Sequence, residues 1–231
     1  MAILPSIRAS FLSSCLWDCA NPGPEADRTV INNVPEPSLL FGEYFSTFRE
    51  AIDFARIMHE GQRRLDGLPF LSHPIAVLQI VLSASKRLPR SAYVSAILHD
   101  VLEDGPTSRE EIAEIFGERT AEIVAAVTRP RSPHRRFVLL HEAAYLMQMR
   151  RATVRNPAVL LVKMADRLHN LRTSEFLPRE RRAALIEQTA ELYLPLLHAM
   201  TPREAPFAAA HTKLLRMLEE ELARQRGGGR V

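Results

Sequence analysis

The stretch Val159–Thr173, VLLVKMADRLHNLRT, has the length and apolar spacing of a buried helix, yet an aspartate interrupts its apolar run. Two further stretches share this character: Leu68–Leu82 (LPFLSHPIAVLQIVL) and Tyr93–Gly105 (YVSAILHDVLEDG). Apolar helical faces seldom carry imidazole or carboxylate groups, because burying an unpaired charge costs on the order of several kcal/mol or more. We therefore expect three helices to pack around one shared polar centre.

The rest of the sequence also favours helices. Ala, Leu, Glu and Arg are abundant, Gly is scarce before the C-terminus, and no alternating strand pattern persists. With 46% hydrophobic residues among 231, the chain has enough apolar side chains for a sizeable core. We predict an all-α bundle of roughly eight to ten helices. The predicted helices are 47–60, 74–85, 91–102, 108–117 with Thr107 as its N-cap, 118–128, 137–150, 157–172, 178–199 and a last one ending near 226.

Proline and glycine signals divide the chain into three parts. Residues 1–40 contain five prolines and no persistent period, so we predict an irregular N-terminal segment. Residues 41–200 should form the helical domain. Residues 201–231 should add a C-terminal helix and a flexible tail that ends in GGGRV.

The composition argues against several classes of protein. The net charge is only +3, and Arg mostly alternates with Glu instead of clustering with aromatic residues, so no nucleic-acid partner is expected. No run of about 18 apolar residues occurs, so no membrane partner is expected either. Cys15 and Cys19 do not make a disulfide framework, and we expect a cytoplasmic protein.

The polar residues inside the apolar runs are of types that bind metals. Imidazole and carboxylate ligands without thiolate suit Mn²⁺, Zn²⁺ or Fe. A bound divalent ion lowers the pKa of its water and neutralises charge on a phosphoryl oxygen. The candidate ligands for one such ion are His73, His99, Asp100 and Asp166.

Two acidic residues follow the His-Asp pair by one helical turn. Glu103 comes four residues after His99, and Asp104 comes four after Asp100, so each pair should share a helix face. We expect Glu103 and Asp104 to position or deprotonate a water molecule. The less specific interpretation is a helix C-terminus that meets the turn at Gly105.

Donors for a phosphorylated substrate occur near these motifs. Arg63 and Arg64, in the polar loop between the first two helices, would bring guanidinium groups to phosphates. Asn170 comes four residues after Asp166, so an amide able to bond a substrate would lie beside a predicted ligand.

Simpler interpretations exist for the single residues, and only the joint pattern outweighs them. An isolated histidine in an apolar helix is more often a satisfied core residue than a ligand. Arg167, His169 and Arg172 fit ordinary surface charge. No site role is assigned to Cys15, Cys19, His134, His141, His198 and His211.

In combination, the motifs resemble a known family. The order GQRR, GLPFLSHP, ILHDVLED and VKMADRLHNLRT is similar to the hydrolase domain of RelA/SpoT-type alarmone enzymes, which are HD-domain metal-dependent phosphohydrolases. The likeness runs from about Phe48 to about Leu197 and includes Phe116–Arg129 (FGERTAEIVAAVTR) and Glu191–Leu196 (ELYLPL). It implies an HD-domain helical bundle.

The resemblance also implies an activity. The family removes the 3′-pyrophosphate from guanosine tetra- and pentaphosphate (ppGpp and pppGpp), giving GDP or GTP and pyrophosphate, typically with Mn²⁺. By this resemblance one Mn²⁺ is held by His73, His99, Asp100 and Asp166, the catalytic acidic pair is Glu103 and Asp104, Arg64 lies near the base, and Asn170 and Thr173 contact the nucleotide. We expect Arg63, together with Arg64, to steady the nucleotide.

One departure from the family pattern leaves the substrate open. After the arginine the family usually has lysine, whereas this chain has Leu65, followed by Asp66. Two alternatives keep the enzyme class: an adenine alarmone, or the 2′-phosphate of NADPH. A third alternative is a non-catalytic nucleotide-binding module, which should have lost a ligand or the acidic pair.

The resemblance further predicts a stand-alone alarmone hydrolase. Long relatives append a synthetase domain, whereas only residues 198–231 follow the match here. A homo-oligomer, and a cognate alarmone synthetase in the same cell, stay open as partners.

Overall fold

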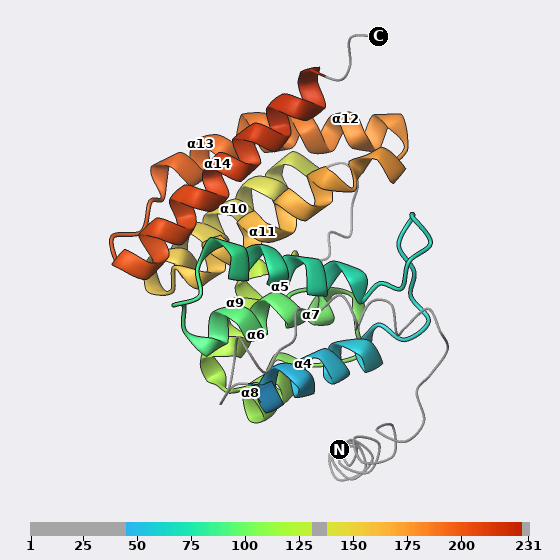
Figure 1. Cartoon of the computed structure of the whole chain (residues 1–231), viewed down its shortest axis with the longest axis vertical. Helices are drawn as coiled ribbons and strands as arrows, with labels where there is room; N and C mark the ends of the chain where they lie inside the picture. The colour runs from blue at the N-terminus through green and yellow to red at the C-terminus, as the bar shows by residue number, and fades with distance from the viewer. Residues whose placement is uncertain (1–44, 131–137, 228–231) are drawn as a thin grey trace. The chain divides into compact units, whose positions relative to one another are not determined.

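The computed structural model describes residues 45–130 and 138–227, which belong to one compact unit, Pro37–Val231. In these residues the chain is all-α, as predicted, with no strand beyond one isolated bridge between Arg63 and Pro69. If α6 with α7, and α12 with α13, are each counted as one interrupted helix, nine helices are present in this part of the chain, within the predicted range of eight to ten (Figure 1). The α-helices are α4 (Phe45–Met58), α5 (Ser72–Ala84), α6 (Arg90–Leu98), α7 (Val101–Asp104), α8 (Arg109–Phe116), α9 (Glu118–Val127), α10 (Val138–Arg155), α11 (Ala158–Arg172), α12 (Arg179–Gln188), α13 (Leu194–Ala199) and α14 (Ala205–Gly227).

Several predictions concern residues that the structure does not describe. They are those for residues 1–40 with Cys15 and Cys19, for His134, for the side chain of His141 and for the end of the tail. Within the described residues, no helix combines the length and the apolar character that a bilayer crossing requires.

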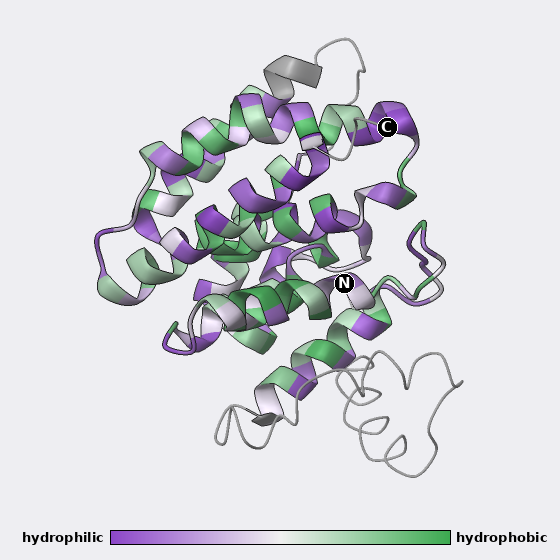
Figure 2. Cartoon of the chain, turned by 45° about the horizontal axis from the view of Figure 1, so that its top comes forward, coloured by the Kyte–Doolittle hydropathy of each residue, from purple (hydrophilic) through white to green (hydrophobic). Residues whose placement is uncertain are grey.

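Helix α11 is the centre of the bundle. Every residue from Ala158 to Leu168 is buried, the charged ones included. The helix packs against α5, α6, α9, α10 and α14, and Figure 2 shows the hydrophobic residues of the bundle gathered toward its interior. Helix α14, predicted as a separate C-terminal part, therefore covers one side of α11. A polar group on α11 lies deep in the protein and needs a partner.

The predicted helix 91–102 is broken at its His-Asp pair. Helix α6 ends at Leu98, His99 and Asp100 form a turn, and the four-residue helix α7 follows. The Nδ1 atom of His99 donates to the carbonyl of Ala96 at 2.9 Å. In a continuous helix that carbonyl would accept from the N–H of Asp100, so the imidazole competes with the helical hydrogen bond.

Helix α7 still presents the acidic pair one turn later. The N–H groups of Glu103 and Asp104 both donate to the carbonyl of Asp100 at 3.0 Å. Gly105 ends the helix where space is short, because a Cβ at this position would lie 2.7 Å from the carbonyl oxygen of Val101. A larger residue would push the acidic turn away from its place.

The predicted helix 178–199 is continuous but not uniform. Helix α12 passes into a π-helical turn, Thr189–Tyr193, and then into α13. Pro195 accounts for this change, because it lacks an N–H and its ring would clash with the carbonyl of Glu191 in an α-helical register. Tyr193, the last residue of the π turn, is fully buried.

Two local features position the ends of neighbouring helices. The loop between α4 and α5 folds back on itself, with Arg64 and Leu68 bonded through their backbones at 2.9 Å and Gly67 at a φ of 84° that favours glycine. The N-cap of α8 is Ser108, not the predicted Thr107. Its Oγ accepts from the N–H of Glu111 at 3.1 Å, while the Thr107 hydroxyl donates to the Glu111 carboxylate at 2.8 Å. Both residues have capping chemistry, and the backbone geometry selects between them.

Candidate metal centre

The four side chains predicted as metal ligands meet at one point. His73 lies in the first turn of α5, His99 and Asp100 form the turn after α6, and Asp166 lies on α11. The Nε2 atom of His73 lies 3.1 Å from Nε2 of His99, 3.2 Å from Oδ1 of Asp166 and 3.4 Å from Oδ2 of Asp100. Nε2 of His99 lies 3.2 Å from Oδ2 of Asp100 and 3.8 Å from Oδ1 of Asp166. We call His73, His99, Asp100 and Asp166 the ligand cluster.

The outer nitrogen of each imidazole has its own partner. Because a carbonyl can only accept, the bond from His99 to Ala96 places a hydrogen on Nδ1 and directs Nε2 of His99 toward the ligand cluster. Nδ1 of His73 lies 2.8 Å from Nδ1 of His169. Burial, together with the charges of His73 and Arg64, lowers the pKa of His169 to about 3, so its ring is neutral and can accept from His73. Both Nε2 atoms then face the cluster.

The charges in the ligand cluster fit a divalent cation. Burial lowers the pKa of His73. Burial also opposes the protonation of His99, but the carboxylates of Asp100 and Asp166 outweigh it and raise the pKa of His99 to about 9. Burial would raise the pKa of Asp100, yet the two histidines hold it at about 2. Two ionised carboxylates therefore stabilise positive charge beside the two histidine rings, as they would stabilise a divalent ion of Mn²⁺ or Zn²⁺ type bound by this N/O ligand set.

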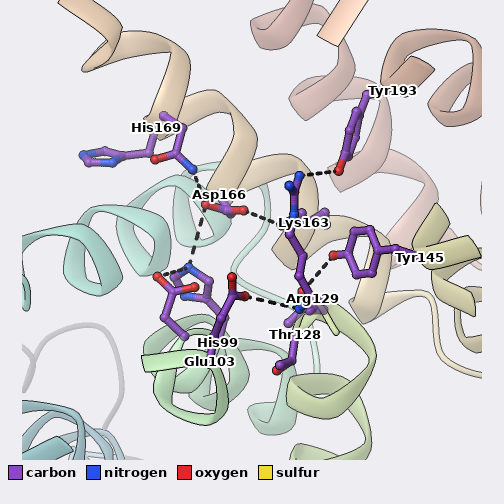
Figure 3. Close-up of polar contacts among 12 residues, drawn as sticks. His99, Glu103, Thr128, Arg129, Tyr145, Lys163, Asp166, His169 and Tyr193 are labelled. Carbon is purple, nitrogen blue, oxygen red and sulfur yellow. Dashed lines mark hydrogen bonds and ion pairs between the residues drawn. The ribbon is translucent and has the colours of Figure 1, made fainter. Parts of the chain in front are cut away.

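The carboxylate of Asp166 is held from two further sides. Asn170 donates its amide to Oδ1 of Asp166 at 2.6 Å, and the ammonium of Lys163 lies 2.8 Å from Oδ2. Burial would raise the pKa of Asp166, but Lys163 and the two histidines hold it well below its usual range. Figure 3 shows Asp166 between His99 and Lys163. One carboxylate thus faces the ligand cluster with one oxygen and a buried lysine with the other.

The two acidic residues of α7 have different surroundings. Glu103 is half-buried, its Oε2 accepts from the backbone N–H of Arg129 at 3.2 Å, and burial raises its pKa. Asp104 is exposed at the end of the helix, and its carbonyl accepts from the amide of Gln62 at 3.0 Å. The arrangement gives one acidic residue a fixed orientation and leaves the other accessible to solvent.

The residues predicted to bind substrate line one pocket of about 360 Å³. Arg64 donates from Nη2 to the hydroxyl of Thr173 at 3.0 Å, which joins the loop after α4 to the end of α11. Because Asn170 both lines this pocket and bonds Asp166, the pocket adjoins the ligand cluster. Its lining residues are Arg63, Arg64, Leu65, Asp66, Phe70, Asn170, Thr173, Phe176, Leu177 and Leu185.

The surface-charge interpretation is wrong for two residues of α11. His169 contacts His73, and Arg167 is only 4% exposed, with its guanidinium 3.6 Å from the centre of the Tyr193 ring. Arg172 is exposed, as that interpretation requires. Sequence spacing placed Arg167, His169 and Arg172 near the end of the helix. It did not show that His169 faces α5 and that Arg167 faces the π turn.

Sequence reasoning also missed His59 at the end of α4. His59 is buried, its Nδ1 lies 3.0 Å from Oε1 of Gln62, and its ring stacks on Phe70 with centroids 4.5 Å apart. Gln62 in turn bonds the carbonyl of Asp104. The signal was present, because His59 is a polar residue on the apolar face of a predicted helix, the same criterion that selected His73.

Comparison with known proteins agrees with this architecture. The profile of the family described as HD domain matches residues 51–200. The bifunctional (p)ppGpp synthase/hydrolase SpoT of Escherichia coli is 33% identical over 186 residues, which cover 78% of this chain and 26% of that protein. A guanosine-3′,5′-bis(diphosphate) 3′-pyrophosphohydrolase of Haemophilus influenzae is 38% identical over 146 residues, covering 63% of this chain and 21% of that one.

A solved structure is also similar. It is that of a metazoan ortholog of SpoT, described as hydrolysing ppGpp, and it matches with a TM-score of 0.57 at 22% identity over 74% of this chain and 94% of that one. At this identity the likeness concerns the fold. The chain spans about a quarter of the length of the curated relatives named above. Because the family profile covers most of the described helices, ligand cluster included, the chain belongs to the HD-domain family.

Proposed function

We propose that this protein is a metal-dependent 3′-pyrophosphohydrolase of guanosine 3′,5′-bis(diphosphate), releasing pyrophosphate and GDP, or GTP from the pentaphosphate. The observation that carries the proposal is the convergence of His73, His99, Asp100 and Asp166 beside a pocket with guanidinium, hydroxyl and amide donors. The similarity to proteins named for this reaction supports it. We assign the activity to residues 41–200, with 201–231 as a supporting C-terminal part.

The ligand cluster would hold one Mn²⁺. The four ligand atoms would be Nε2 of His73, Nε2 of His99 and a carboxylate oxygen from each of Asp100 and Asp166. When bound, such an ion supplies a water of lowered pKa and neutralises charge on a phosphoryl group. His169 would fix the orientation of the His73 ring, and Asn170 would fix the orientation of the Asp166 carboxylate, because hydrogen-bond partners behind metal ligands orient them.

Glu103 and Asp104 would handle the attacking water. A carboxylate whose pKa is raised by burial is a better proton acceptor near neutral pH than one in open solvent. Glu103 has this character, and the N–H of Arg129 orients it. Asp104 is exposed and would assist by hydrogen bonding at the mouth of the site.

The pocket beside Asn170 would hold the nucleotide. Arg64 and Thr173, bonded to each other, would flank the base, while Phe176 supplies apolar wall. Arg63 is exposed, donates to the carbonyl of Gly67 at 2.8 Å and would reach toward the phosphates.

The test is hydrolysis by the purified protein with Mn²⁺ and guanosine tetraphosphate, followed by chromatography of the nucleotides. Wild-type protein should release pyrophosphate and GDP, and Asp100→Ala should not. A wild-type protein that gives no more pyrophosphate than Asp100→Ala would refute the proposal. Tight nucleotide binding without turnover would instead indicate a non-catalytic nucleotide module.

An adenine nucleotide is the second candidate substrate. Leu65 is 63% exposed at the pocket and brings no cation to the position where the resembled family usually has lysine. Turnover of guanine and adenine alarmones and of NADPH should be compared under one condition. Leu65→Lys should increase the ratio of guanine to adenine turnover if this position selects the base.

We further propose that the enzyme acts in the cytoplasm, where nucleotide alarmones occur as substrates. A homo-oligomer and a cognate alarmone synthetase are the partners to be tested. Light scattering of the purified protein would detect the first, and growth rescue of cells that express an alarmone synthetase would detect the second.

A further inference from the structure

Arg129, Glu142 and Tyr193 form a hydrogen-bonded group outside the ligand cluster and the pocket lining, in which Glu142 and Tyr193 are buried and the Arg129 side chain is 37% exposed. Arg129 donates from Nη2 to Oε1 of Glu142 at 3.1 Å and to the hydroxyl of Tyr193 at 2.9 Å. The hydroxyl of Tyr193 donates to the same Oε1 of Glu142 at 2.7 Å. We call these three residues the anchor triangle; Figure 3 shows two of them, Arg129 and Tyr193.

Two of the three residues of the anchor triangle are buried. Glu142 is 8% exposed and Tyr193 is 1% exposed, so their polar atoms depend on one another and on Arg129. Burial would lower the pKa of Arg129, but Tyr193 and Glu142 outweigh it and raise that pKa above its ordinary value. The guanidinium therefore stays charged and held in place.

The backbone of Arg129 holds an acidic residue of the candidate site. The last N–H of the α9 ladder is that of Thr128, which donates to the carbonyl of Val124 at 3.0 Å. The next N–H, that of Arg129, lies beyond the helix and donates to Oε2 of Glu103 at 3.2 Å. This N–H therefore bonds a side chain in place of a helical carbonyl, and the anchored side chain of Arg129 is one constraint on its direction.

We propose that Tyr193 and Glu142 are positioning residues for Glu103, acting through Arg129. This inference rests on the proposed function, in which Glu103 handles the water. The path runs from the π turn at Tyr193, through the guanidinium of Arg129, to its backbone N–H and then to the Glu103 carboxylate. The π turn contributes to this arrangement because it carries Tyr193, the buried residue that completes the anchor triangle.

A second path toward the site must be separated from this one. Lys163 bonds Asp166 and lies 5.5 Å from the centre of the Tyr145 ring, and Arg129 lies at the same distance from that ring. A disturbance that travelled this way would alter a metal ligand and so weaken Mn²⁺ binding. A disturbance that travelled through Glu103 would leave Mn²⁺ binding unchanged and lower kcat.

The first experiment removes one hydroxyl. Tyr193→Phe should lower kcat for guanosine tetraphosphate by roughly tenfold, because small displacements of a reacting group have effects of this size or larger. KM and the Mn²⁺ affinity measured by calorimetry should stay at wild-type values. A wild-type kcat, or a loss of Mn²⁺ affinity, would overturn the assignment.

Tyr93→Phe is the matched control. Tyr93 is also buried, and its hydroxyl accepts from the N–H of Leu88 and donates to the carbonyl of Ser85, each at 3.0 Å, two partners outside the anchor triangle. This variant should lose stability as Tyr193→Phe does but keep its kcat. An equal fall in kcat in both variants would show a general structural effect and contradict a positioning role.

A double-mutant cycle gives the sharper test. Once Glu103→Gln has removed the carboxylate, adding Tyr193→Phe should change kcat by less than twofold, because the carboxylate that Tyr193 helps to position is no longer there. Fully multiplicative effects would refute the path through Glu103. An inactive wild-type protein would instead refute the proposed function, so the two failures are distinguishable.

Discussion

The ligand cluster and the anchor triangle are both polar groups packed within the same helical bundle, but their charges are balanced in different ways. In the anchor triangle, Oε1 of Glu142 accepts from both Arg129 and Tyr193, and the guanidinium of Arg129 balances the carboxylate charge. In the ligand cluster, two imidazole Nε2 atoms and two carboxylates lie 3.1–3.8 Å apart and face one another. The comparison teaches that convergence of several imidazoles and carboxylates on one point, more than burial of charge, indicates a cation-binding site.

Asp166 belongs to the ligand cluster and also bonds the buried ammonium of Lys163. Lys163 and Arg129 of the anchor triangle lie at the same distance from the Tyr145 ring. Oδ1 of Asp166 faces the histidines and its Oδ2 faces Lys163, whose pKa burial would lower but Asp166 raises above its ordinary value. Substitutions on either side of this carboxylate therefore test whether the two regions differ as described.

The largest effect is expected from Asp166→Ala, because it damages both sides at once. Metal binding and hydrolysis should be lost, and Lys163 would be left buried without its partner, at a cost of about 3–5 kcal/mol in the free energy of unfolding. Urea unfolding and Mn²⁺ calorimetry measure the two effects. Glu220→Ala, at an exposed ion pair of 3.6 Å with Arg216, is the control and should cost about 1 kcal/mol or less. Unimpaired Mn²⁺ binding by Asp166→Ala would exclude it as a ligand.

His99→Ala should affect only the metal side. Mn²⁺ at a hundred times its dissociation constant should stabilise the wild-type protein by about 2.7 kcal/mol, and a chelator should remove this gain. The variant should show neither effect and no hydrolysis. A similar Mn²⁺-dependent rise in melting temperature in His99→Ala would mean that the ion binds elsewhere.

Lys163→Met should affect the opposite side and depend on the metal. Without metal, the uncompensated Asp166 charge should lower the free energy of unfolding by about 3 kcal/mol. With Mn²⁺ bound the loss should be smaller, because the ion balances the same carboxylate. Urea unfolding with and without Mn²⁺ measures the difference, with the exposed Lys213→Met as control. Equal losses in both conditions would mean that Lys163 and the ion do not share Asp166.

The smallest effect is expected at the rim of the nucleotide pocket. Arg64→Ala removes the bond to Thr173 and should raise KM roughly tenfold with little change in kcat, as loss of uniform binding does. Steady-state kinetics and Mn²⁺ calorimetry check this, and Mn²⁺ affinity should be unchanged. A fall in kcat at constant KM would instead place Arg64 in the chemical step.

Local pattern was sufficient for the fold and for the ligand cluster. The apolar period predicted the helices, and the polar residues inside apolar runs identified His73, His99, Asp100 and Asp166, which the structure brings together. The same pattern did not predict the break after Leu98, because the bond from the His99 ring to the Ala96 carbonyl depends on the ring's orientation. It also did not predict the π turn before Pro195, although proline carried a signal for it.

The sequence by itself determined that these helices form and that a few charged groups would be buried in them, because periodicity and desolvation act residue by residue. Only the tertiary structure decided which buried group faces which. Lys163 and Asp166 are both polar residues in one apolar run, yet packing turns Lys163 toward Tyr145 and one oxygen of Asp166 toward the histidines. His169 and Arg167 gained partners on α5 and the π turn for the same reason. Contacts between distant segments depend on how helices cross, and helical period carries no information about that.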